Sequence, residues 1–118
     1  MLKIAVVVLA DTETHGDLGR AVNALETARE FKEAGDEVAI VFDGAGTRWV
    51  PKFSDPEHRK HALWVSVKDK VAGACSFCSA AFSVKEEVQA AGIKLLDDFD
   101  NHPSLRGYII DGYQVITF

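Results

Sequence analysis

The sequence has little cysteine, little proline and no long apolar segment: two cysteines and three prolines in 118 residues. Cys75 and Cys78 lie three positions apart, so they cannot crosslink distant parts of the chain as disulfides of small secreted proteins do. The longest apolar run, residues 4–10, is much shorter than the roughly 20 residues of a membrane-spanning helix. A signal peptide would have small residues at a cleavage site after this run, whereas residues 11–13 are Asp-Thr-Glu. We therefore expect a cytoplasmic protein without a membrane segment.

Positive charge is also in short supply, because 13 Lys and Arg face 18 Asp and Glu, for a net charge of −5. A broad phosphate-binding surface needs an excess of basic side chains, so we expect no direct nucleic-acid partner. The composition, 47% hydrophobic and 26% charged, excludes intrinsic disorder. The length is typical of one domain, which we predict to span residues 1–118.

What is present is an alternation of apolar strands with helical patterns. Residues 2–9 and 37–42 are Val- and Ile-rich runs typical of strands buried on both faces, and a helix over 18–34 connects them. We predict further strands at 71–74, 93–96 and 114–118, and further helices at 56–70, 83–92 and 103–110, with a loop over 43–55. Five strands alternating with four helices predict an α/β fold, a three-layer α/β/α sandwich with a five-stranded parallel sheet.

Ligand sites of open parallel sheets lie beyond the carboxyl ends of the strands. Three loops are predicted there, and polar or aromatic residues in them are candidates for lining a site. The candidates are Asp11, Thr12 and His15 in the first loop, Asp43 and Gly44 in the second, and Phe77 between the two cysteines of the third.

The third loop has the sharpest chemical signal, the sequence Cys75-Ser76-Phe77-Cys78. A thiol between a strand and a helix faces unpaired N–H groups and the positive end of the helix dipole, which favour the thiolate. We therefore predict Cys75 as a nucleophile and Cys78, one helical turn further, as its resolving or shielding partner. The alternative is that both are small buried apolar residues, as free cysteines often are.

Metal and cofactor signals are weak by comparison. A zinc site needs four ligands, whereas the sequence offers one cysteine pair and scattered histidines. His58 and His61 fit the solvated surface of a helix. His102 is most simply interpreted as a turn or cap residue. The pair Gly44 and Gly46 lacks the third glycine of a dinucleotide-binding loop. We predict neither a metal nor a cofactor.

Aromatic residues of these loops are a further feature. We expect Trp49, Phe53, Phe77 and Phe82 to be partly exposed around the site. There they would form a subunit interface or the wall of a pocket, the alternative being ordinary loop packing.

Several segments together resemble the DsrE/DsrF-like family over essentially the whole chain: the opening strand, residues 35–38 and 43–46, Cys75 and the final segment 112–118. The resemblance implies a three-layer α/β/α fold with a five-stranded parallel sheet, and assembly of copies into trimers or hexamers. In sulfur-relay members, the cysteine matching Cys75 carries sulfur as a persulfide. The resemblance thus implies that Cys75 accepts sulfur from a donor protein and passes it to an acceptor. Relay members have a basic segment where this chain has the apolar residues 78–82.

Three hypotheses follow. In the first, the protein is an intracellular persulfide carrier, with sulfurtransferase-like transfer if it is catalytic, and Cys78 releases the sulfur by closing a disulfide. In the second, the Cys-x-x-Cys pair is a redox switch or weak thiol oxidoreductase without sulfur cargo. In the third, the cysteines only pack, and the loops at the strand ends bind a small ligand or a protein.

Overall fold

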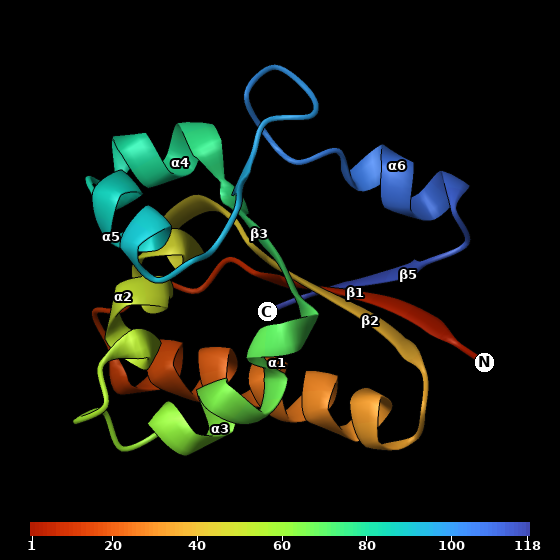
Figure 1. Cartoon of the computed structure of the whole chain (residues 1–118), viewed down its shortest axis with the longest axis horizontal. Helices are drawn as coiled ribbons and strands as arrows, with labels where there is room; N and C mark the ends of the chain where they lie inside the picture. Colours follow the sequence, from red (N-terminus) through yellow and green to blue (C-terminus); the bar gives the residue numbers. More distant parts are fainter.

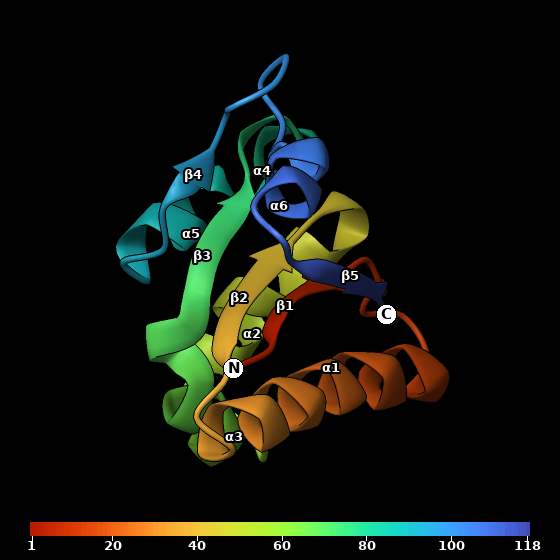
Figure 2. The same cartoon turned by 90° about the vertical axis from the view of Figure 1, so that its right-hand side faces the viewer.

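The computed structural model describes residues 1–118 and contains one five-stranded sheet in the order β4-β3-β2-β1-β5 (Figures 1 and 2). The strands are β1 (Lys3–Val8), β2 (Glu37–Phe42), β3 (Val71–Cys75), β4 (Leu95–Leu96) and β5 (Gln114–Thr117). Every neighbouring pair is parallel. The predicted α/β fold with a five-stranded parallel sheet is confirmed.

The helices are more numerous than predicted, and those after the first are shorter. They are α1 (His15–Glu33), α2 (Trp49–Ser54), α3 (His61–Val67), α4 (Ser76–Ala81), α5 (Lys85–Ala90) and α6 (Leu105–Ile110), with 3₁₀ turns η1 (Gly44–Arg48) and η2 (Lys68–Lys70). None of them combines the length and the apolar character that crossing a membrane requires.

The segment predicted as a loop over 43–55 is instead helical, because its aromatic residues belong to the core. Trp49 and Phe53 are buried and stack with ring centroids 4.9 Å apart. The indole Nε1–H of Trp49 donates to the carbonyl of Ala10 at 3.0 Å. The expectation that these two rings are partly exposed is therefore wrong, whereas Phe77 and Phe82 are exposed.

Two predicted helix starts are also wrong for local reasons. The helix expected from residue 56 begins at His61, since the Asp55 carboxylate accepts the Glu57 N–H at 2.9 Å and the His58 ring accepts the Lys60 N–H at 3.0 Å. Such side-chain bonds to the backbone compete with a helix. The capping box expected at residues 83 and 86 does not form, because Ser83 adopts a left-handed conformation (φ 59°).

The two faces of the sheet carry very different amounts of core. On one face, 18 buried residues form the major core, among them Ile4, Phe42, Phe53 and Trp64, under α1, α2, α3 and α5. The other face carries the minor core, Val7, Val41 and Leu96, with partly buried residues of α6 packed on it. Figure 1 shows α1 and α3 below the sheet and α6 above it.

Candidate functional site

Four side chains from separate segments meet at the carboxyl end of the sheet. Asp43 follows β2, Cys75 ends β3, Cys78 lies in α4, and His102 lies in the loop between β4 and α6. One potential ligand atom from each of them lies within 4.8 Å of the other three. We call these four residues the thiol cluster. Its position agrees with the rule that sites of parallel sheets form beyond the carboxyl ends of the strands.

Cys75 is the fixed centre of the cluster. It is the N-cap of α4, where its Sγ accepts the Cys78 N–H at 3.3 Å and lies 3.2 Å from His102 Nδ1. Its exposed fraction is 0%. Burial raises the pKa of the Cys75 thiol to about 12, although the N–H bond from Cys78 opposes that rise. Burial therefore opposes the thiolate that the N-terminus of α4 was expected to stabilise.

Cys78 is the more accessible of the two thiols. Cys78 is partly exposed, whereas Cys75 is buried, and neither cysteine forms a disulfide. Its thiol donates to Asp43 Oδ1, with the sulfur and oxygen 3.6 Å apart. Both sulfurs therefore have a polar partner from another segment, an arrangement that packing alone does not require.

The backbone fixes Asp43 in its place beside the thiols. The Asp43 N–H donates to the Val8 carbonyl at 3.0 Å, and its carboxylate caps η1 by accepting the Gly44 N–H at 2.9 Å. A Cβ on Gly46 would lie 1.9 Å from the Val8 carbonyl oxygen, so only glycine allows η1 to approach β1 this closely. Gly46 thus helps to position the Asp43 carboxylate beside the thiols.

His102 is the member of the cluster that sequence reasoning missed, since it predicted only a turn or cap. It does lie in a turn: its backbone exchanges two hydrogen bonds of 2.8 Å with Phe99. Asp100 and Asn101 have left-handed backbones there, with φ 49° and 66°. The Asn101 carbonyl accepts the Phe77 N–H at 2.9 Å, and the Phe77 ring lies 4.9 Å from the His102 ring. Phe77 therefore holds this loop over Cys75.

The first predicted loop joins the second loop but not the cysteines. Asp11 pairs with Arg48 at 2.8 Å, and Glu13 pairs with the same guanidinium at 2.7 Å. The Thr12 N–H donates to the Asp11 carboxylate, and His15 is exposed at the first position of α1. No hydrogen bond connects Asp11, Thr12 or His15 to either thiol.

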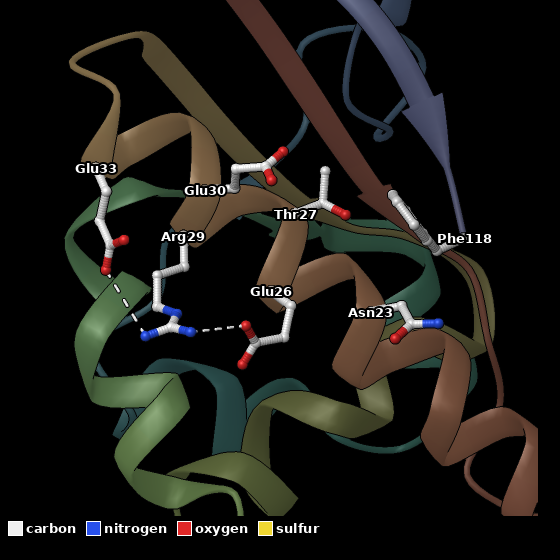
Figure 3. Close-up of a pocket in the computed structure, with 7 residues that line it drawn as sticks. All are labelled: Asn23, Glu26, Thr27, Arg29, Glu30, Glu33 and Phe118. Atoms are coloured by element: carbon white, nitrogen blue, oxygen red, sulfur yellow. Dashed lines mark hydrogen bonds and ion pairs between the residues drawn. The ribbon is translucent and has the colours of Figure 1, made fainter.

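The larger surface hollows lie elsewhere. One, of about 550 Å³, is bordered by α1 and Phe118, where Arg29 pairs with Glu26 at 3.0 Å and with Glu33 at 3.7 Å (Figure 3). A second, of about 660 Å³, is lined by residues of α2, α3 and α5. Neither is lined by a member of the thiol cluster, which leaves the cluster as the place where chemically reactive groups converge.

Comparison with known proteins gives a family match, a sequence relative and a solved structure of similar fold. The sequence model of the DsrE/DsrF-like family matches residues 4–118. An uncharacterised protein of Methanocaldococcus jannaschii, MJ0733, is 35% identical over 95 residues, which cover 80% of this chain and 77% of that protein. A solved structure of a conserved protein of unknown function from Bacteroides thetaiotaomicron, BT1422, has a TM-score of 0.64 at 16% identity, covering 97% of this chain and 94% of the other. That likeness concerns the fold.

Proposed function

Because the chain belongs to the DsrE/DsrF-like family, we propose that it carries sulfane sulfur as a persulfide on Cys75. It would receive the sulfur from a donor protein and pass it to an acceptor protein in the cytoplasm. The observation that carries this proposal is the contact of Cys75 Sγ with His102 Nδ1 at 3.2 Å. A thiol with an adjacent base is the arrangement that activates a sulfur nucleophile.

The transfer step needs no oxidant or reductant. His102 takes the Cys75 proton, and the sulfur attacks the outer sulfur of the donor's persulfide. The new bond joins Cys75 Sγ to that outer sulfur, the donor's sulfur–sulfur bond breaks, and the donor leaves as a thiolate. Because His102 removes the proton as the sulfur attacks, no free thiolate has to accumulate on the buried Cys75, whose pKa is raised.

Cys78 supplies the release step. Cys78 loses its S–H proton to solvent and its sulfur attacks Cys75 Sγ. The bond between Cys75 Sγ and the cargo sulfur breaks as the disulfide between the two residues forms, and the cargo leaves to the acceptor as hydrosulfide. The cargo sulfur is reduced and the two cysteines are oxidised, so a dithiol reductant must then restore the pair. The sulfurs lie within 4.8 Å of each other, and the Cys78 side chain is the one that reaches solvent.

The surface around the cluster suits a protein partner. Phe77, whose ring lies against that of His102, is 52% exposed, and Phe99, in the same loop as His102, is 70% exposed. Exposed aromatic side chains are enriched in interfaces. A partner that contacts them could displace the loop and open a path to Cys75. We also expect copies of the chain to form homo-oligomers, trimers or hexamers, as the family resemblance implies.

The test is intact-mass analysis of the chelator-treated, reduced protein after incubation with polysulfide. We expect the wild type to gain sulfur, Cys75→Ser to gain none, and the matched variant Cys78→Ser to load and hold the sulfur longer. The proposal fails if the wild type gains no sulfur or if Cys75→Ser gains as much. A chain that takes up no sulfur, and whose thiols are alkylated no faster than a model thiol, would be a binding module.

The proximity of the two reduced sulfurs also supports a second candidate, a thiol–disulfide switch without cargo. A switch must have a reduction potential near that of the cytosolic glutathione pool. Equilibration in glutathione buffers, followed by alkylation and mass analysis, measures that potential. A value near the cytosolic one, in a protein that takes up no sulfur, would favour the switch over the carrier.

A further inference from the structure

We propose that Asp43, Cys75, Cys78 and His102 form a four-coordinate Zn²⁺ site. The inference does not rest on the persulfide proposal, because it concerns which ion the four side chains can hold when no sulfur is loaded. Its basis is the composition of the cluster and the mutual distances within it.

The donor set is one that zinc prefers. Structural zinc sites take four ligands from cysteine sulfur, histidine nitrogen and carboxylate oxygen, commonly with two cysteines in a Cys-x₂-Cys spacing. Cys75 and Cys78 have that spacing, and His102 and Asp43 supply the third and fourth ligands from other loops. Two thiolates and an imidazole also argue against magnesium and calcium, which prefer oxygen ligands.

The distances agree with a tetrahedron around one ion. Zinc–ligand bonds of about 2.0–2.3 Å place neighbouring ligand atoms of a tetrahedral site about 3.3–3.8 Å apart. Cys75 Sγ lies 3.2 Å from His102 Nδ1, and Cys78 Sγ lies 3.6 Å from Asp43 Oδ1. No pair within the cluster exceeds 4.8 Å. Shifts of about 1 Å or less from the present distances would therefore bring every ligand pair into the range of a tetrahedral zinc site.

The surroundings already hold the ligands as outer partners of a metal site do. The Cys78 N–H donates to Cys75 Sγ, and the Gly44 N–H donates to Asp43 Oδ1. Such hydrogen bonds orient ligands and stabilise their negative charge. Cys75 is buried and the other three ligands are partly buried, so the ion would be shielded from water without being closed off.

Binding requires only the exchange of protons for the ion. The S–H bonds of Cys75 and Cys78 break, two sulfur–zinc bonds form, and the two protons leave to the solvent, with no change of oxidation state. The ion replaces the direct contact between Cys75 and His102 and the direct contact between Cys78 and Asp43. Coordination also engages the lone pair with which the Cys75 sulfur attacks a persulfide. Zinc loading and sulfur loading of the same chain therefore exclude each other.

Cobalt substitution tests the site directly. The full-length protein, reduced and stripped of metal, is titrated with Co²⁺, and Zn²⁺ is then added as competitor. We expect thiolate-to-cobalt charge transfer, the visible bands of tetrahedral cobalt, saturation at one ion per chain and displacement by zinc. We expect zinc binding to weaken at least about 10-fold in each of four variants: Cys75→Ser, Cys78→Ser, His102→Gln and Asp43→Asn. Loss of a residue that only orients a ligand already weakens metal affinity by about that factor, and loss of a ligand should cost at least as much.

Matched controls separate ligand loss from general effects. His15→Gln and Asp97→Asn change the same residue types at exposed positions outside the cluster, and we expect them to bind as the wild type does. The proposal is overturned if the wild type shows no thiolate charge transfer, or if His102→Gln and Asp43→Asn both retain wild-type affinity.

A second measurement does not depend on how well a variant folds. We expect Zn²⁺ to slow alkylation of both cysteines of the wild-type protein and the chelator to reverse this protection. Unchanged alkylation of both thiols at saturating Zn²⁺ overturns the site. Because sulfur uptake is measured on metal-free protein, a chain that binds zinc but takes up no sulfur refutes only the carrier, and the converse result refutes only the zinc site.

Discussion

The two faces of the sheet differ in depth, and the thiol cluster depends on the shallower one. The major core joins 18 buried residues under four helices, whereas the minor core has three buried residues under α6. The reason is topological. Strands β1 to β4 follow one another in one direction across the sheet, so their right-handed crossovers all lie on one face, and only the return to β5 crosses the other.

This difference indicates which part of the molecule can move. The loop with His102 leads directly into α6, the element that covers the minor core. By contrast, β2, which precedes Asp43, and β3, which ends at Cys75, are anchored by the major core. Regions with few buried contacts open at lower free energy than the rest of a fold. We therefore expect His102 to be displaced more easily than the cysteines, and four substitutions probe this contrast.

The largest effect is expected from Phe53→Ala in the major core. Phe53 is fully buried and stacks on Trp49 and Trp64. Removing a buried phenylalanine side chain lowers the free energy of unfolding by about 3–5 kcal/mol. Urea denaturation measures this, with Phe99→Ala at an exposed position as the control, expected to change stability by about 0.5 kcal/mol or less.

A smaller loss of stability is expected from Leu105→Ala at the start of α6. Leu105 is partly buried against the minor core, so the loss should be about 1–2 kcal/mol, below the 2–5 kcal/mol of fully buried leucines. Hydrogen exchange should increase in residues 97–110 and remain unchanged in α1. A loss equal to that of Phe53→Ala would mean that the two faces do not differ in depth as described.

The cap of α6 comes next in size. Ser104 Oγ accepts the Gly107 N–H at 3.1 Å, and replacing such a cap by alanine costs about 1 kcal/mol. We expect Ser104→Ala to speed alkylation of Cys75, since it loosens the helix that follows the His102 loop. Ser104→Asp keeps an acceptor and should behave as the wild type. Equal alkylation rates in all three proteins would show that α6 does not control access.

The smallest effect concerns the ion pair between α1 and η2. Lys32 lies 2.7 Å from Asp69, and this bond lowers the pKa of the Asp69 carboxyl. Because that carboxyl is largely exposed, Asp69→Asn should cost less than about 0.5 kcal/mol. A depressed pKa stabilises the fold above the carboxyl's unfolded pKa, and this contribution disappears as pH falls through the folded value. The difference between variant and wild type should therefore vanish in strong acid; a constant difference contradicts the prediction.

The fold could be predicted because its determinants are local and repeated. The buried strands are uninterrupted apolar runs, and the sheet confirms those at 37–42 and near 71–74 closely. Helix boundaries failed where side chains compete with the backbone, as at Asp55 and His58. Propensity and spacing do not describe those competing bonds.

Of the site, the sequence indicates the edge of the sheet but not which loops meet there. Asp43 lies with the cysteines because β2 and β3 are neighbours, whereas Asp11 follows β1, one strand further away. Strand order is not encoded in any single segment. His102 was missed because two left-handed residues, Asp100 and Asn101, turn its loop back over the cysteine. The signal available in the sequence was that His102 follows β4, which places it at the same edge of the sheet as Cys75.

The shortness of the outer strands has a consequence for association. The sheet ends in β4, which has two residues, and in β5, which has four. Unpaired strand edges invite the addition of strands from other chains, and short edges are one way in which proteins avoid this. Copies of this chain are therefore poor templates for extending the sheet from one molecule to the next. Short edges of this kind thus protect the sheet against edge-to-edge aggregation.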